Sequence, residues 1–255
     1  MKLSSDIAAV VSGGASGLGE ASARRLAAQG VRVTVFDRDA GRGKAVADEI
    51  KGLFVQVDVS DADSVASGFA AARAAQGQER ITVNCAGIAP AGKTAGRDGV
   101  HDPALFARVV QVNLVGTFYV ASAAAAGMIT ADPLDADGAR GVIVNTASVA
   151  AFEGQVGQVA YASSKGGVAG MTLPMARDLA RSGVRVVAIA PGLFGTPMLR
   201  SLPEEVQQSL GQQVPFPQRL GDPAEYASLV AHIVENQMLN GDVIRLDGAI
   251  RMAPR

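Results

Sequence analysis

The sequence predicts an α/β protein with a Rossmann-type, doubly wound parallel sheet of about seven strands and helices on both faces. Short runs of β-branched residues alternate with longer, alanine-rich segments, which is the pattern of repeated βαβ units. A glycine-rich turn directly follows the first of these runs and opens a helical segment. The chain has 255 residues, 48% of them hydrophobic and 18% charged, and a chain of this length can share one hydrophobic core. We therefore expect a single domain over residues 1–255.

Each predicted element follows from one of these segments. The predicted strands are Ile7–Val11, Val31–Phe36, Phe54–Val57, Ile81–Asn84, Val142–Asn145, Arg185–Ile189 and Val243–Leu246. The predicted helices fill the intervals and start near Gly17, Asp63, Pro103, Gln158, Pro203 and Pro223. Glycine is typical of helix ends, and Gly30 and Gly183 stand where two of these helices should stop.

Three stretches interrupt the alternation. Residues Ala89–Asp102 and Thr130–Arg140 are rich in turn-forming residues and are expected to be surface loops. Residues 191–222 place several prolines among apolar positions. A connection of that length is often a lid or a wall of a binding site.

The composition argues against several classes of protein. A net charge of −1 gives no basic footprint for nucleic acid. The single cysteine, Cys85, cannot form an internal disulfide, and no apolar run of signal-peptide length precedes Asp6, so we expect a cytoplasmic protein. The uncharged stretch Val109–Ala131 is long enough to suggest a membrane span, but Gln111, Asn113 and its many alanines favour a buried helix at a domain or subunit interface.

The segment VSGGASGLGEASARRLAAQG, after the first strand, is a glycine-rich turn that opens a helix. Glycines let the backbone approach a pyrophosphate, and a helix N-terminus offers free N–H groups and a positive dipole end. The spacing of Gly13, Gly17 and Gly19 differs from the usual G-x-G-x-x-G pattern, so the support comes from the strand before the turn and the helix after it. This context indicates a dinucleotide site.

Asp37 closes the second predicted strand, in the segment VTVFDRD. A carboxylate at this place can accept hydrogen bonds from both hydroxyls of an adenine ribose and repels a 2′-phosphate. Arg38 could instead turn toward such a phosphate, and Asp37 could be a solvated turn residue. We interpret the pattern as favouring NAD over NADP.

A serine, a tyrosine and a lysine are predicted to meet at one edge of the sheet. Ser148 follows a strand in NTAS, and Tyr161 and Lys165 in YASSK are spaced to share a helix face. Hydride transfer from an alcohol carbon requires a base near the alcohol oxygen. Lowering a tyrosine pKa from near 10 by about three units takes ~4 kcal/mol, which a cation about 4 Å away supplies at an effective dielectric constant of about 20. We therefore expect Lys165 and a positive nicotinamide ring to lower the pKa of Tyr161, and Ser148 to hydrogen bond to the substrate oxygen. The alternative is a surface tyrosine beside a surface lysine.

Together these motifs resemble the short-chain dehydrogenase/reductase family. The matching residues are Ser12-Gly13-x3-Gly17-x-Gly19, Asn84-Cys85-Ala86-Gly87, Asn113, Ser148, Tyr161-x3-Lys165 and Pro191-Gly192. The resemblance covers essentially the whole chain. Ser12 stands where threonine is usual and keeps the hydroxyl, and Cys85 is a small residue where a second asparagine is usual.

The resemblance implies roles for individual residues. Ser148, Tyr161, Lys165 and Asn113 would be catalytic. Asn113 would hold a water that links Lys165 to solvent, although by sequence alone it could equally be a polar packing residue. Lys165 would also bind the nicotinamide ribose, and Thr196 the carboxamide. The expected contacts of the dinucleotide are Ser12, Gly13, Ser16, Gly17, Leu18, Gly19, Asp37, Asp58, Val59, Cys85, Ala86, Gly87, Tyr161, Lys165, Pro191, Gly192, Leu193 and Thr196.

The C-terminal third resembles one branch of the family, the type II 3-hydroxyacyl-CoA dehydrogenases, which also act on hydroxysteroids. The resembling segments are APGLFGTPMLRSLPEEVQQSL, VPFPQRLGDPAEYASLV and LNGDVIRLDGAIRM. In this branch Gln155 and Gln158 would lie beside the substrate oxygen, and a set of apolar residues would form a lid over the acyl or steroid body. The implied substrate contacts are Ser148, Gln155, Gln158, Tyr161, Leu193, Phe194, Leu199, Leu202 and Phe216. Ordinary core packing is the alternative for each apolar member.

The expected activity is hydride transfer between NAD(H) and the 3-hydroxy or 3-oxo group of an acyl-CoA. The alternatives are a 3-oxoacyl-carrier-protein or acetoacetyl-CoA reductase that uses NADPH, and a dinucleotide-binding protein without turnover. Residues 1–90 would be mainly the cofactor-binding half, and residues 140–222 would carry the catalytic residues and the substrate lid. The resemblance also implies a homotetramer. We expect no nucleic-acid or membrane partner, and no metal, because His101 and His232 have no ligand cluster beside them.

Overall fold

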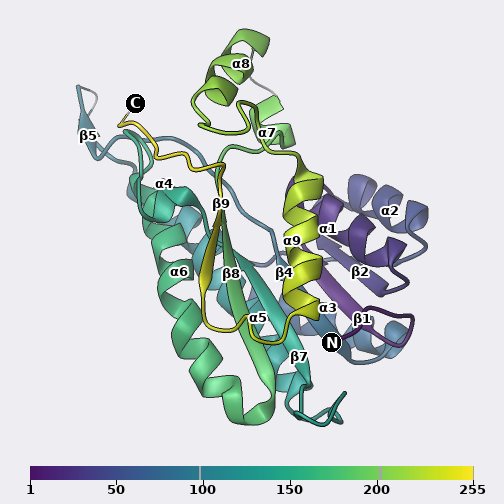
Figure 1. The fold of residues 1–255 in the computed structure, drawn as a ribbon. Helices are drawn as coiled ribbons and strands as arrows, with labels where there is room; N and C mark the ends of the chain where they lie inside the picture. The colour runs from purple at the N-terminus through teal and green to yellow at the C-terminus, as the bar shows by residue number, and fades with distance from the viewer. Residues whose placement is uncertain (98, 201–202, 255) are drawn as a thin grey trace.

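The fold is known from a computed structural model, which describes residues 1–97, 99–200 and 203–254. Within these residues seven parallel strands form one sheet in the order β3-β2-β1-β4-β7-β8-β9, with helices on both faces (Figure 1). The strands are β1 (Ala8–Ser12), β2 (Arg32–Asp37), β3 (Leu53–Gln56), β4 (Glu79–Asn84), β7 (Gly141–Thr146), β8 (Val184–Pro191) and β9 (Val243–Leu246). The predicted fold class is confirmed, and each predicted strand is present with its ends shifted by a few residues.

Two helical layers cover the sheet. One consists of α1 (Gly17–Ala28), α2 (Ala40–Glu49) and α9 (Pro223–Glu235), with α1 packed against α9. The other consists of α3 (Ala62–Gln76), α5 (Gly116–Met128) and α6 (Val159–Leu179). Successive strand residues face opposite layers, because side chains alternate along a strand. Val11 therefore packs in the core beneath α1, while Val10 packs in the core beneath α3 and α5.

Helix α2 was not predicted from the sequence. Its residues include Gly41 and Gly43, which weaken a helical pattern. The second of these glycines is required by packing, because a Cβ on Gly43 would overlap the ring of Phe54 on β3. Gly43 thus weakens the helical pattern in the sequence and also lets helix α2 lie close to the sheet.

The expected loop Ala89–Asp102 and the long connection have structure of their own, whereas Thr130–Arg140 forms turns without a helix or strand, as expected. Residues Ala89–Asp102 contain a short hairpin of β5 (Ala95–Gly96) and β6 (Gly99–Val100). Residues 191–222 contain α7 (Pro197–Arg200) and α8 (Glu204–Gln212), which stand above the carboxyl ends of the strands in Figure 1. The connection therefore rises over the edge of the sheet where ligands bind in folds of this type.

The helical run Pro103–Met128 joins α4 (Pro103–Val110), a π-helical turn at Gln111–Val115, and α5. By length and a mean hydropathy of 1.5 it would suffice to cross a bilayer, and 44% of that apolar window is buried in the fold. Its buried residues, among them Val120, Ala124 and Met128, pack in the core on the α3 face of the sheet. The uncharged stretch thus covers the sheet, as a buried helix would.

A crevice opens where the order of the strands reverses. The chain runs outward from β1 to β2 and β3, and then returns to place β4 on the other side of β1. Loops that follow β1 and β4 diverge at such a switch point and leave a crevice at the carboxyl ends of the strands. The loops after β7 and β8 border the same edge, so the motifs predicted to carry the chemistry reach one place.

Candidate active site

The crevice has a volume of about 430 Å³ and is built by four loops of the sheet. Its walls include the glycine turn after β1, the Cys85–Gly87 segment after β4, the Thr146–Ser148 segment after β7 and Pro191–Gly192 after β8. Of the residues expected to contact a dinucleotide, it is lined by Gly13, Ser16, Gly17, Leu18, Gly19, Asp37, Asp58, Val59, Cys85, Ala86, Gly87, Tyr161, Lys165, Pro191, Gly192 and Thr196. Ser12 lies just beneath, where its hydroxyl donates to Asn84 Oδ1 at 3.1 Å.

The glycine turn has no room for side chains at two positions. Gly13 has a φ of +67°, and a Cβ there would lie 2.5 Å from the Ala86 amide nitrogen. A Cβ on Gly19 would overlap the carbonyl oxygen of Gly13. Within the described residues, the side chain of the N-cap residue Ser16 caps none of the free N–H groups of α1. An uncapped helix N-terminus beside a turn that a ligand can approach closely fits the pyrophosphate of a dinucleotide.

Asp37 is held at the end of β2 by two backbone N–H groups. Its Oδ2 accepts from Ala15 N at 3.1 Å, and its Oδ1 accepts from Asp39 N at 3.1 Å. Arg38, the residue that could have served a 2′-phosphate, pairs instead with Asp58, with 3.4 Å between Nε and Oδ2. The hydroxyl and backbone N–H of Ser60, with Arg38, hold the pKa of Asp58 below its usual range. This end of the crevice therefore presents a fixed carboxylate.

Ser148, Tyr161 and Lys165 meet at the other end of the crevice. Ser148 caps a 3-10 turn (Val149–Ala151), with its Oγ accepting from Ala150 N at 3.1 Å, and its hydroxyl hydrogen bonds with Tyr161. Tyr161 and Lys165 lie in the first turns of α6, with Lys165 Nζ 5.9 Å from the centre of the tyrosine ring. Lys165 Nζ donates to the carbonyl oxygen of Thr146 at 2.6 Å. The serine, the phenol and the ammonium group thus share one wall.

Lys165 by itself does not bring the pKa of Tyr161 below its ordinary value; the expected lowering also included a positive nicotinamide ring. Burial raises the pKa of Tyr161 above its ordinary value, and the hydrogen bond from Ser148 only partly opposes this. The ammonium group lies toward the ring and is engaged by Thr146. Burial likewise lowers the pKa of Lys165 to about 8. Desolvation is therefore the largest cause of both shifts.

Asn113 lies beneath the crevice, in the π-helical turn, and is not among the described residues that line it. Its carboxamide accepts from Ile88 N at 2.8 Å and donates to Ile88 O at 2.8 Å and Ser164 Oγ at 3.1 Å. A Cβ on Gly87 would lie 3.2 Å from Asn113 Oδ1 and 3.8 Å from Lys165 Nζ, so the three residues approach one point. Asn113 thus ties the loop after β4 to helix α6.

The apolar residues expected to contact the substrate differ in their positions. Phe194 and Leu199 line the crevice, and Leu193 and Phe194 line an adjoining cavity of about 250 Å³. Phe216 is 83% exposed and lines neither. Leu202 lies outside the described residues.

Gln155 and Gln158 line a different hollow from Ser148. The Nε2 of Gln155 donates to Ala253 O at 2.9 Å, and Gln158 Oε1 accepts from Gln155 N at 3.0 Å. Both line a separate hollow of about 370 Å³ beside the hairpin loop. Neither glutamine is among the described residues that line the crevice, and their place beside a substrate oxygen stays a prediction.

Two functional residues were missed by the sequence analysis. Thr146 supplies the acceptor of Lys165, and its hydroxyl lies 2.7 Å from the hydroxyl of Tyr226, a fully buried residue of α9. The position of Thr146 within NTAS was a usable signal. Nothing in the sequence pointed to Tyr226, because its helix follows the catalytic segment by many residues and only the fold brings the two together.

Comparisons with known proteins agree with this geometry. A family model described as short chain dehydrogenase matches residues 7–207. The chain belongs to the short-chain dehydrogenase family. It is 55% identical over 252 residues to 3-hydroxyacyl-CoA dehydrogenase type-2 of Homo sapiens, covering 97% of this chain and 96% of that protein. The protein of the same name from Drosophila melanogaster is 53% identical over 249 residues, covering 96% and 97%.

A solved structure extends the agreement to three dimensions. The crystal structure of 3-hydroxyacyl-CoA dehydrogenase type-2 from Mycobacterium avium superposes with a TM-score of 0.94 at 43% identity, covering 98% of each chain. The short-chain dehydrogenase fold is thus shared over nearly the whole length. Membership of this family also makes NAD or NADP the class of cofactor that the glycine turn serves.

We expect Gly19→Ala to weaken NADH binding by at least about tenfold, because the new methyl group displaces the carbonyl of Gly13 and opens the glycine turn. Fluorescence titration of NADH measures the dissociation constant. Gly41→Ala in α2 is the matched control, since the nearest atom to its Cβ is Asp39 Oδ1 at 3.6 Å. NADH binding by Gly19→Ala within twofold of the parent would contradict the close packing of the turn.

We expect the Tyr161 phenol to ionise above pH 10 in the cofactor-free protein, since burial raises its pKa. Saturation with NAD⁺ should move the midpoint downward, because the positive nicotinamide ring favours phenolate. Saturation with neutral-ring NADH should move it less. The measurement is an alkaline ultraviolet difference titration of the parent protein against Tyr161→Phe. A midpoint at or below 10 in the free protein contradicts the dominance of burial.

Proposed function

We propose that this dehydrogenase interconverts 3-hydroxyacyl-CoA and 3-oxoacyl-CoA thioesters with NAD(H). The observation that carries the proposal is the 55% identity, over nearly the full length of both chains, to an enzyme named 3-hydroxyacyl-CoA dehydrogenase type-2. Ser148, Tyr161 and Lys165 support it, because they lie together in the crevice that the glycine turn also lines.

The residues of the crevice fit a dinucleotide along its length. The N-terminus of α1 would hold the pyrophosphate, Asp37 the adenine ribose, and Asp58 and Val59 the adenine. A bound dinucleotide supplies the hydride donor or acceptor and, when oxidised, a positive ring. Lys165 would bind the nicotinamide ribose with the N–H donors that Thr146 leaves free.

Tyr161 is proposed to transfer the proton of the 3-hydroxyl group. In reduction, its neutral phenol donates a proton to the substrate oxygen, and the raised pKa of Tyr161 keeps that proton in place until it is needed. In oxidation, the phenolate accepts the proton of the alcohol. Ser148 holds the substrate oxygen by hydrogen bonding as charge develops on it. Lys165, with a pKa of about 8, is mostly protonated at neutral pH and supplies positive charge beneath the ring.

Phe194 and Leu199 are proposed to contact the acyl body. Both line the crevice, and Phe194 also separates it from the adjoining apolar cavity. An apolar wall beside the catalytic tyrosine suits the hydrocarbon of a 3-oxoacyl group. Assembly as a homotetramer and a cytoplasmic location remain predictions from the sequence.

We expect the protein to prefer NADH over NADPH, because Asp37 places a fixed negative charge where a 2′-phosphate would lie. Asp37→Asn keeps the shape and an acceptor for Ala15 N but removes the charge. The ratio of kcat/KM for NADH to that for NADPH should fall about tenfold or more, which is about 1.4 kcal/mol. Asp39→Asn is the matched control, since Asn also caps a helix. A parent enzyme that prefers NADPH would exclude NAD as the cofactor.

We expect the parent protein to reduce acetoacetyl-CoA and longer 3-oxoacyl-CoAs with NADH. Tyr161→Phe should lower kcat about 10³-fold without weakening NADH binding, because only the transferable proton is lost. Tyr119→Phe on α5 removes a hydroxyl outside the residues that line the crevice and serves as the control. A substrate panel with a hydroxysteroid and an acyl-carrier-protein thioester tests the alternatives. Turnover of those compounds without turnover of any acyl-CoA would refute the proposal.

A further inference from the structure

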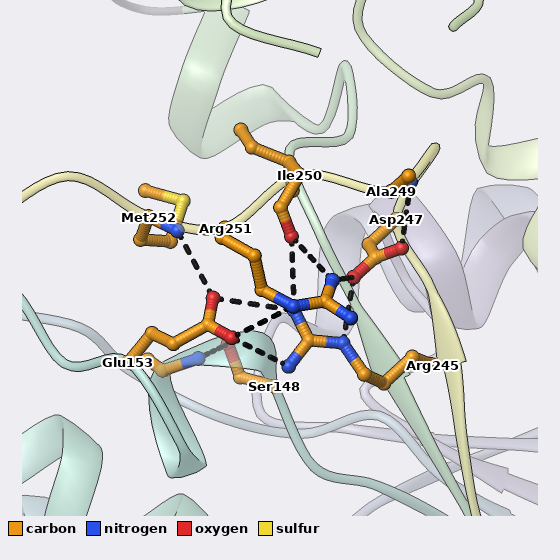
Figure 2. Close-up of polar contacts among 9 residues, drawn as sticks. Ser148, Glu153, Arg245, Asp247, Ala249, Ile250, Arg251 and Met252 are labelled. Carbon is orange, nitrogen blue, oxygen red and sulfur yellow. Dashed lines mark hydrogen bonds and ion pairs between the residues drawn. The ribbon is translucent and has the colours of Figure 1, made fainter. Parts of the chain in front are cut away.

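Glu153 binds Arg245 on the last strand, β9, and also the C-terminal tail, which we define as residues 247–254. Its carboxylate accepts from Arg245 Nη1 at 2.9 Å and Nη2 at 3.2 Å, and from Met252 N at 3.0 Å (Figure 2). Arg251 adds an ion pair, with 3.3 Å between its Nε and Glu153 Oε1. Both oxygens of Glu153 are thus used to hold a segment that lies about 90 or more residues away in the sequence.

The tail is organised around a second carboxylate. Asp247 is nearly buried and pairs with Arg245 Nε at 2.7 Å and with Arg251 Nη1 at 3.2 Å. Both guanidinium groups also donate to the carbonyl oxygen of Ile250, at 3.0 and 2.8 Å (Figure 2). Two carboxylates therefore alternate with two guanidinium groups, and the charges of the cluster balance.

Glu153 lies five residues after Ser148, at the end of the same short segment. The 3-10 turn begins at Ser148, and Glu153 N donates to Val149 O at 3.0 Å. The guanidinium group of Arg245 also lies over the ring of Phe152, at 5.6 Å from its centre. The contacts of Arg245 with this segment, at Phe152 and Glu153, therefore fall four and five residues after Ser148.

The backbone of the tail continues along the same segment. Val156 N donates to Pro254 O at 3.0 Å, and the side chain of Gln155 donates to Ala253 O at 2.9 Å. The tail thus follows residues 153–156 from Met252 to Pro254. The segment is held by the Ser148 turn at one end and by the tail along the rest of its length.

We propose that Glu153 is a positioning residue for Ser148, and that the C-terminal tail is the support against which it acts. The proposal rests on the proposed function, because it assigns Ser148 to the substrate oxygen. The carboxylate of Glu153 fixes the end of the turn that Ser148 begins, so the Ser148 hydroxyl stays within reach of Tyr161 and the substrate. A displacement of about 1 Å in such a group can cost roughly a hundredfold in rate.

The closing experiment separates positioning from general stability. Glu153→Ala removes the carboxylate, and Glu153→Gln keeps the shape and one acceptor but leaves Arg245 and Arg251 to share the charge of Asp247. We expect Glu153→Ala to lower kcat at least about tenfold and Glu153→Gln to lower it less. The dissociation constant of NADH should stay within twofold of the parent, because the glycine turn and Asp37 lie on other strands.

Glu79→Gln is the matched control. Glu79 also accepts two bonds from one arginine, Arg73, at 3.0 and 2.8 Å, and its side chain is 2% exposed. It lies at the start of β4, at the end of the strand opposite the crevice. This variant should lose thermal stability at least as much as the Glu153 variants and keep its kcat. If Glu79→Gln and Glu153→Ala lose kcat equally, the effect is one of general stability and the proposal is wrong.

Hydrogen exchange provides a readout that needs no substrate. We expect backbone amides of residues 148–156 to exchange faster in both Glu153 variants than in the parent, and those of residues 13–19 to be unchanged. Unchanged exchange of residues 148–156 overturns the proposal. A kcat of Glu153→Ala within twofold of the parent also overturns it, and so does a loss of NADH binding equal to the loss in kcat. If the parent turns over no 3-oxoacyl-CoA, the proposed function fails, while the exchange measurement still decides whether Glu153 fixes the turn. Glu153→Gln carries the test if Glu153→Ala does not fold.

Discussion

The burial of Lys165 beneath the crevice is the constraint on which the active site depends. Lys165 is 5% exposed, and among the described residues one carbonyl, that of Thr146, accepts a hydrogen bond from its ammonium group. An ammonium group has three donors, and leaving them unpaired in a buried place is costly. Burial therefore lowers the pKa of Lys165 to about 8. A ligand with hydroxyl groups relieves this cost when it enters, so the same lysine that destabilises the free site favours an occupied one.

The same burial determines when Tyr161 can act as a base. In the free protein, desolvation raises the pKa of Tyr161, and the hydrogen bond from Ser148 offsets only part of that rise. Phenolate forms readily only when further positive charge enters the crevice, because attraction must exceed the cost of burying an anion. In the proposed mechanism the hydroxyl of Ser148 then hydrogen bonds with both the phenol and the substrate oxygen. Proton transfer is in this way coupled to occupation of the site, and a neutral phenol is the resting state.

The sequence predicted those features that depend on local pattern. Each strand was predicted, because a strand shows as a short local run of β-branched residues. The grouping of Ser148, Tyr161 and Lys165 was also predicted, because all three lie in one stretch of the sequence that follows a strand. Helix α2 was missed, because Gly43 is dictated by the ring of Phe54 rather than by helix propensity. The rise that burial alone gives the pKa of Tyr161 was not predicted, because the sequence gives the spacing of charges and not the extent of desolvation. The expected lowering by Lys165 together with a nicotinamide ring stays a prediction. Contacts between distant segments, such as Thr146 with Tyr226, have no local signature.

The two ends of the crevice are held by different sets of contacts, and this separation has a functional consequence. At the dinucleotide end, the glycine turn packs on Ala86 and Asp37 is held by Ala15 N, contacts that join neighbouring strands of the sheet. At the catalytic end, the segment after Ser148 is held by Glu153 and a tail from beyond the last strand. Parallel strands bring all these loops to one edge of the sheet, but each loop is held in place by its own contacts. Binding of the dinucleotide and placement of the substrate oxygen can therefore change independently, which lets one fold keep its cofactor while its substrate varies.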